Sequence, residues 1–122
     1  MDKKKLEERT KKFALEAIRF VADLPRNKIT DVMGYQFLKC GTSIGANYRE
    51  ANRAQSRQDF IHKIAIVEKE ASETQYWLEL FEAADIGNPD SRLWLLEESS
   101  ELVAIFTSIG KSTKSKQKIK AS

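Results

Sequence analysis

The chain has 122 residues, of which 41% are hydrophobic and 32% charged, and its formal net charge is +3. This length fits one domain with a core of its own, and a single cysteine excludes an intrachain disulfide. No window approaches the roughly 18 consecutive apolar residues of a membrane span, and residues 1–12 lack the apolar core of a secretory signal. A cytoplasmic protein is therefore expected.

Apolar residues at three-and-four spacing predict a first helix over about residues 5–24, which ends before Pro25. A second helix is predicted over 30–52, with Thr30 or Asp31 as its N-cap. It contains Gly34, Gly41 and Gly45. Because each glycine costs about 1 kcal/mol relative to alanine inside a helix, three of them indicate close approach of another helix, from this chain or from a neighbour.

A third helix is predicted over 56–86, starting at Ser56. One apolar stripe on it faces the core, and Ile66, Trp77 and Leu80 form an adjoining one. The combined face is wider than burial within one bundle requires. We therefore expect Ile66, Trp77 and Leu80 to lie at an oligomer interface.

Gly87 and Asn88 are suited to the end of the third helix and the N-cap of a fourth, which is predicted over 89–110. Residues 111–122 are rich in lysine and serine, lack acids and are predicted to form a disordered tail. Four helices with short connectors favour an all-α, up-and-down antiparallel four-helix bundle at 1–110.

This topology brings the N-terminus, the second connector and the C-terminus to one end of the bundle. That end contains fifteen basic and five acidic residues. A concentrated basic end is typical of proteins that bind polyanions, phosphates above all, although a solvated, solubilising surface would show the same charges. The predicted phosphate contacts are Arg49, Arg53, Arg57, Lys63, Lys111, Lys114, Lys116 and Lys118, within a tail that runs to Lys120.

Catalytic chemistry has little support in the sequence. The one histidine, His62, cannot supply the paired Glu-x-x-His units of a bundle metal site, and Cys40 lies on the core stripe of its helix. The glycines of the second helix lack the lysine and the preceding strand of a phosphate loop. We therefore expect no enzyme activity, catalytic residue, metal or cofactor.

Four polar residues are candidates for a site: Ser43, Asn47 and Glu50 on one side of the second helix, and Glu73 on the third. They could form a polar binding site. The alternative, which we prefer, is a hydrogen-bonded network between packed helices that fixes their register.

Three blocks in order carry a resemblance: residues 41–51 (GTSIGANYREA), 56–61 (SRQDFI) and 71–78 (ASETQYWL). They resemble a bacterial four-helix bundle family that includes proteins encoded by intervening sequences within large-subunit ribosomal RNA genes. The likeness covers about residues 13–106. It implies an up-and-down bundle, a ring of five subunits and no known enzymatic activity. Related bundles that accompany diversity-generating reverse transcriptases are basic pentamers that bind nucleic acid.

Two functional hypotheses follow. The first is a homo-oligomer, expected to be a pentamer, that binds the backbone of RNA or DNA through its basic end. The second is a protein-protein adaptor that docks a partner, such as a reverse transcriptase, on the broad face of the third helix or on the acidic end. No membrane partner is expected.

Overall fold

The computed structural model describes the backbone of residues 1–121 and the side chains of residues 1–116. It contains α1 (Lys3–Ala22), α2 (Lys28–Ala51), α3 (Arg57–Ala83) and α4 (Pro89–Ala121). Residues 1–121 contain no β-strand. The predicted all-α class is confirmed. Among the described residues, no helix combines the length and apolar character needed to cross a bilayer.

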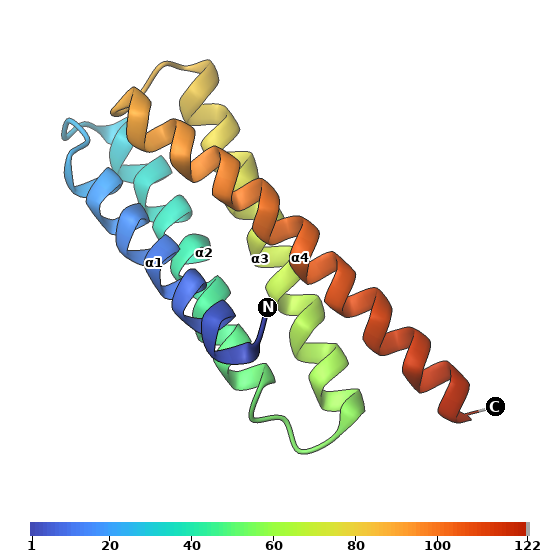
Figure 1. Cartoon of the computed structure of the whole chain (residues 1–122). Coiled ribbons are helices and arrows are strands. Elements are labelled where there is room, and N and C mark those ends of the chain that lie inside the picture. Colours follow the sequence, from blue (N-terminus) through green and yellow to red (C-terminus); the bar gives the residue numbers. More distant parts are fainter. Residues whose placement is uncertain (122) are drawn as a thin grey trace.

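The helices run up, down, up and down, so that each packs against the next (Figure 1). The α2–α3 and α3–α4 interfaces are the most extensive, and α1 meets α4 over a much smaller area. The start of α1, the α2–α3 connector and the last turns of α4 lie at the same end of the bundle (Figure 1). This end is called the basic end below.

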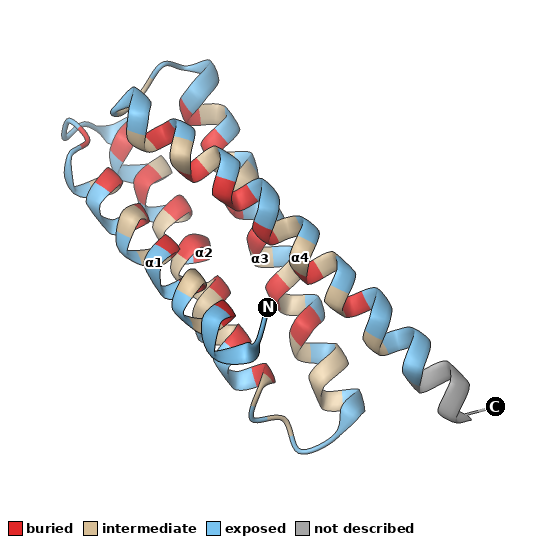
Figure 2. Ribbon diagram, viewed as in Figure 1, coloured by how far each residue is buried: buried red, intermediate tan, exposed pale blue. Residues whose placement is uncertain are grey.

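The core is built from the inward stripes of all four helices (Figure 2). One phenylalanine from each helix is completely buried: Phe13, Phe37, Phe81 and Phe106. Phe20, Phe37 and Phe81 make edge-to-face contacts with one another, at centroid distances of 5.2–6.0 Å. Such contacts add stabilisation beyond the apolar area that they bury.

The helix starts follow from local capping. Ser56 caps α3 by accepting a hydrogen bond from the Asp59 amide at 3.0 Å, as predicted. The prediction for α2 is wrong by three residues or more, because Asn27 is the N-cap. Its side chain accepts from the Thr30 amide, and the Thr30 hydroxyl accepts from the Asn27 amide. Thr30 therefore completes a reciprocal capping box and does not itself begin the helix.

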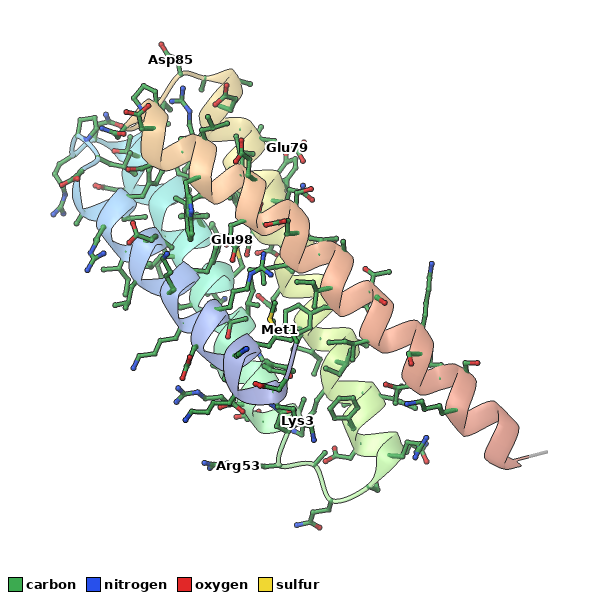
Figure 3. The ribbon with its side chains drawn as sticks, viewed as in Figure 1. Met1, Lys3, Arg53, Glu79, Asp85 and Glu98 are labelled. Atoms are coloured by element: carbon green, nitrogen blue, oxygen red, sulfur yellow. The ribbon has the colours of Figure 1, made fainter. Side chains whose placement is uncertain are left out.

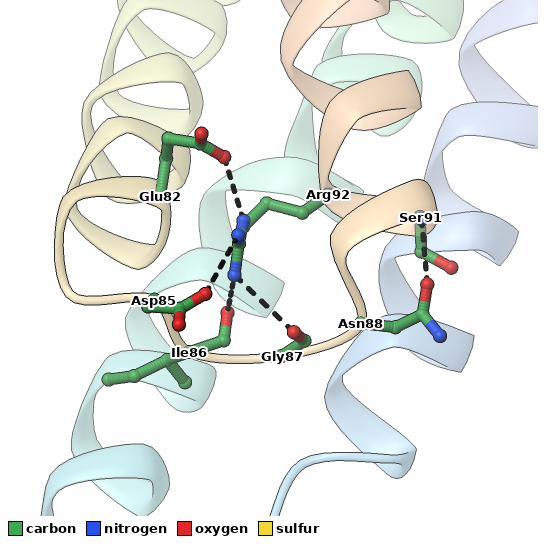
Figure 4. Close-up of polar contacts among 7 residues, drawn as sticks. All are labelled: Glu82, Asp85, Ile86, Gly87, Asn88, Ser91 and Arg92. Atoms are coloured by element: carbon green, nitrogen blue, oxygen red, sulfur yellow. Dashed lines mark hydrogen bonds and ion pairs between the residues drawn. The ribbon is translucent and has the colours of Figure 1, made fainter.

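The α3–α4 corner is organised around Arg92, which is 5% exposed. Its guanidinium donates to Glu82 and Asp85 and to the carbonyls of Ile86 and Gly87 (Figure 4). Asp85, with φ of 53°, takes the left-handed position that ends α3, so Gly87 is not the residue that terminates this helix as predicted. Gly87 has φ of 92°, and a Cβ there would overlap the Phe20 ring.

The glycines of α2 serve the contact with α1 of the same chain. Gly34 faces Val21, Gly41 faces Ala17 and Phe13, and Gly45 faces Thr10. A Cβ at Gly45 would lie only 3.0 Å from the Thr10 hydroxyl oxygen, whereas one at Gly41 would make ordinary 3.7 Å contacts. The predicted close approach of a helix to this surface is confirmed.

The predicted end of the fourth helix near Gly110 is wrong, because α4 continues to Ala121. The tail that was predicted to be disordered from residue 111 is therefore helical over residues 111–121. Gly110 is a packing position: it is buried against Ile64 and Glu68 of α3, and a Cβ there would meet the Glu68 carboxylate. The residues after it include no proline, and lysine and glutamine are good helix formers. Lysines near a helix C-terminus also interact favourably with its dipole.

Candidate nucleic-acid interface

Basic side chains from three separate segments meet at the basic end. Figure 3 shows Lys3 of α1 and Arg53 of the α2–α3 connector at this end, with Asp85 at the opposite end. Arg57 lies in the first turn of α3, and Lys116 lies in the last turns of α4. The helix order alone therefore gathers cations that are far apart in sequence.

A pocket of about 460 Å³ lies among these segments and is lined by Lys3, Arg57, Phe60, Thr113 and Lys116. The three cationic side chains are exposed, while Phe60 is half-buried and packs against the core. The Ser56 cap starts α3 so that Arg57 and Phe60 fall on its first turn. The continuation of α4 past Gly110 is what brings Thr113 and Lys116 to the pocket.

The predicted phosphate contacts divide into two groups. Arg49 lies 3.7 Å from the Glu7 carboxylate, and Lys63 lies 3.9 Å from that of Glu50, so each is partly neutralised. Arg53, Arg57, Lys111, Lys114 and Lys116 have no ion-pair partner among the side chains of residues 1–116. The side chains of Lys118 and Lys120 lie outside the described residues. Lys3, Phe60 and Thr113 were not among the predicted contacts.

Arg9 is one of the fifteen basic residues that the helix order assigns to the basic end, but its charge is used elsewhere. It pairs with Glu98 at 2.7 Å and with Glu101 at 2.8 Å, both on α4. The neighbouring Lys12 lies over the Trp94 ring, 5.4 Å from its centroid. The excess positive charge is therefore concentrated in the first turn of α1, the connector and the last turns of α4.

The network predicted between Ser43, Asn47, Glu50 and Glu73 is not formed. The Ser43 hydroxyl donates to the Lys39 carbonyl, and the Asn47 amide donates to the Ser43 carbonyl, both within α2. Glu50 and Glu73 are exposed. Serine and asparagine reach the carbonyl four residues back in their own helix, and this local acceptor competes with partners on α3.

Ile66, Trp77 and Leu80 are all half-buried, so part of each side chain remains accessible in the single chain. Trp77 also contacts Tyr76, which is 55% exposed, at a centroid distance of 5.6 Å. The interface expected here stays a prediction.

Cys40 is buried, and its thiol lies 3.4 Å from the Phe37 carbonyl. Burial raises its pKa to about 11, which keeps it protonated at neutral pH. His62 is exposed on α3. Among the described residues, His, Cys, Asp and Glu side chains form no group of three that could hold a metal ion.

The fold and the charged end define the chain as a small up-and-down four-helix bundle protein with a basic end. Residues 3–108 match the family model described as 23S rRNA-intervening sequence protein, and the chain belongs to this family. A crystal structure of a protein with unknown function from the S23 ribosomal protein family of Bacteroides thetaiotaomicron VPI-5482 is similar, with 39% identity and a TM-score of 0.79. The likeness covers 86% of this chain and 97% of that one. The comparison with curated proteins gave no match.

Proposed function

We propose that this protein is a non-enzymatic, self-associating bundle that binds the phosphate backbone of RNA or DNA through its basic end. The observation that carries the proposal is the convergence of Lys3, Arg57 and Lys116, from three helices, around one pocket. Arg53, Lys111 and Lys114 add further cations without ion-pair partners among the described side chains. Such cations can release the counterions that surround a nucleic acid, which favours binding at low salt.

Self-association would strengthen this binding because a ring with parallel subunits places all basic ends on one rim. The half-exposed apolar groups Ile66, Trp77 and Leu80 on α3 support a contact between copies. We propose five copies, as the family resemblance implies. Each added subunit raises the number of phosphates that one assembly contacts, and affinity rises with it.

The test is a titration of fluorescent RNA and DNA over a salt series. We expect the logarithm of the binding constant to fall linearly with the logarithm of salt concentration. In the variant Arg53→Gln/Arg57→Gln/Lys116→Gln, the slope should be shallower by about two to three per subunit in contact. The matched control Arg26→Gln/Lys28→Gln/Lys69→Gln removes the same charge from exposed positions outside the basic end and should bind as the wild type does.

Absence of binding at low salt, or equal losses in the two triple variants, would refute the proposal. Mass in solution and the ratio of absorbance at 260 and 280 nm should be measured on the same preparation, since together they report subunit number and carried nucleic acid. A monomer at all concentrations would refute the self-associating part alone.

A second candidate function is a protein-protein adaptor. Tyr76, more than half exposed beside Trp77, favours it, because exposed aromatic groups are enriched where proteins bind one another. Pull-down of one defined protein after nuclease treatment, lost in Tyr76→Ser, would favour this alternative over backbone binding.

A further inference from the structure

We propose that the Lys3–Arg57–Lys116 pocket receives an unpaired nucleotide, so that the protein binds single-stranded nucleic acid more tightly than duplex. This inference rests on the proposed backbone binding and names the class of substrate. It concerns Phe60, which backbone binding alone does not use.

The pocket combines two kinds of contact. Lys3, Arg57 and Lys116 supply positive charge from three helices, and Phe60 contributes an aromatic side chain to the same lining. Among the described residues, the aromatic pairs do not include Phe60, so its ring is not stacked on another aromatic side chain of the bundle. With a volume of about 460 Å³, the pocket is large enough to receive one nucleotide.

Stacking on the Phe60 ring requires a base whose face is not already covered by its neighbours. In a duplex, each base is covered on both faces by its neighbours and presents only its edges in the grooves. In a single strand, a base can turn outward and stack on an aromatic side chain while cations hold the phosphates on either side. A pocket lined by Phe60 and three cations offers both kinds of contact, and stacking tolerates any base because every base has a π face.

Thr113 completes the lining of the pocket. The Thr113 hydroxyl donates to the Ile109 carbonyl at 2.8 Å, so its oxygen remains able to accept a hydrogen bond from a base or a sugar hydroxyl. Two acids lie on the same helix turns. Asp2 caps α1 by accepting from the Lys5 amide, and Asp59 lies half-buried in the first turn of α3. The three lining cations outnumber them.

The experiment uses the full chain with three probes at one ionic strength: a fluorescent 12-nucleotide single strand, the blunt duplex of the same length, and inorganic polyphosphate as a competitor that has no bases. We expect the wild type to bind the single strand about tenfold more tightly than the duplex. Phe60→Leu should lose this preference and leave polyphosphate binding unchanged, while Phe60→Trp should keep it. Tyr35→Leu is the matched control, an aromatic-to-leucine change at an exposed position of α2 outside the basic end, and should behave as the wild type does.

Equal affinity of the wild type for single strand and duplex would overturn the inference, as would an unchanged preference in Phe60→Leu. If circular dichroism shows that Phe60→Leu is not folded, the inference is tested by the wild-type ratio of single-strand to duplex affinity and by Phe60→Trp. Loss of the single-strand preference in a folded Phe60→Trp would also overturn the inference. Failure of all three probes to bind would refute the proposed function itself. Salt-dependent binding of polyphosphate and duplex without a single-strand preference would refute only the inference.

Discussion

Arg9 of α1 holds Glu98 of α4 through two parallel hydrogen bonds, from Nε to Oε2 at 2.7 Å and from Nη2 to Oε1 at 2.8 Å. Nη2 also donates to Glu101 at 2.8 Å. The hydrogen bond to Glu98 raises the Arg9 pKa despite partial burial. Since α1 and α4 share the smallest of the helix interfaces, this cluster is a main polar connection between the first and last helices.

Replacing Arg9 should therefore destabilise the bundle. We expect Arg9→Ala to lower the free energy of unfolding by about 1–3 kcal/mol, and Arg9→Lys to recover only part of it, because an ammonium cannot make the paired bond. Urea unfolding measures this. Arg19→Ala, which breaks the exposed pair with Glu16, is the control and should change stability by less than about 1 kcal/mol. Equal midpoints for Arg9→Ala and Arg19→Ala would contradict the expectation.

Two glycines of α2 should respond in opposite ways to the same change. A Cβ at Gly41 would make 3.7–3.8 Å contacts with Ala17, Phe13 and Thr74, so Gly41→Ala should raise the free energy of unfolding by about 1 kcal/mol. At Gly45, a Cβ would press on Thr10, whose hydroxyl is already bonded to the Glu7 carbonyl at 2.9 Å. Gly45→Ala should therefore gain nothing or lose stability.

Thermal unfolding followed by circular dichroism compares the two variants. The exposed Ala46→Gly, on the same helix, reports the propensity effect alone and should cost about 1 kcal/mol. If Gly45→Ala stabilises the protein as much as Gly41→Ala does, the approach of α1 to α2 at Thr10 is not as close as the structure has it.

The thiol of Cys40 should be inert in the folded protein. It is 1% exposed, and burial raises its pKa to about 11, so the reactive thiolate is scarce at neutral pH. We expect labelling by a disulfide reagent to occur at the rate of unfolding and to become rapid in denaturant. A cysteine introduced at the exposed Ser100 in the background of Cys40→Ser should react at once. Rapid labelling of native Cys40 would show that α2 opens locally.

Most parts of this fold that depend on neighbours in sequence could be predicted, with the cap of α2 as an exception, and the parts that depend on distant residues could not. Apolar spacing identified the core stripes, and Ser56 was recognisable as a cap because its partner is three residues away. Asn27 was missed since several residues nearby can also cap, and only its extended backbone, with φ of −154°, selects it.

Only part of the candidate site could be predicted from the sequence, for the same reason. The helix order predicts which cations lie at the basic end. Arg9 and Glu98, however, are 89 residues apart in sequence, and no local pattern indicates that they pair. Phe60 fitted the core stripe of its helix, so spacing alone gave it no other role. Its place in the pocket depends on the length of α4, and Gly110 was interpreted as a stop when it is a packing position.

Glu70 should make stability depend on pH. Its pKa is raised, first by burial and then by the charge of Glu73, while Lys69 and Lys39 act in the opposite direction. A carboxyl whose folded pKa lies above its unfolded value contributes stability that is fully present below the unfolded pKa and is lost as pH rises through the folded pKa. At pH 7, the ionised Glu70 is therefore less favourable in the folded state than in the unfolded chain.

Glu70→Gln removes that charge and keeps the shape of the side chain. We expect it to raise the free energy of unfolding at pH 7. This advantage should shrink as pH falls through the raised folded pKa of Glu70 and should be gone well below the unfolded pKa of about 4.5, where the wild-type carboxyl is protonated in both states. Urea unfolding at a series of pH values measures the difference. Glu79→Gln removes the same charge from an exposed position on α3 and separates the local effect from that of net charge. An advantage of Glu70→Gln that is the same at every pH, or that Glu79→Gln matches, would show that the burial of Glu70 is not its source.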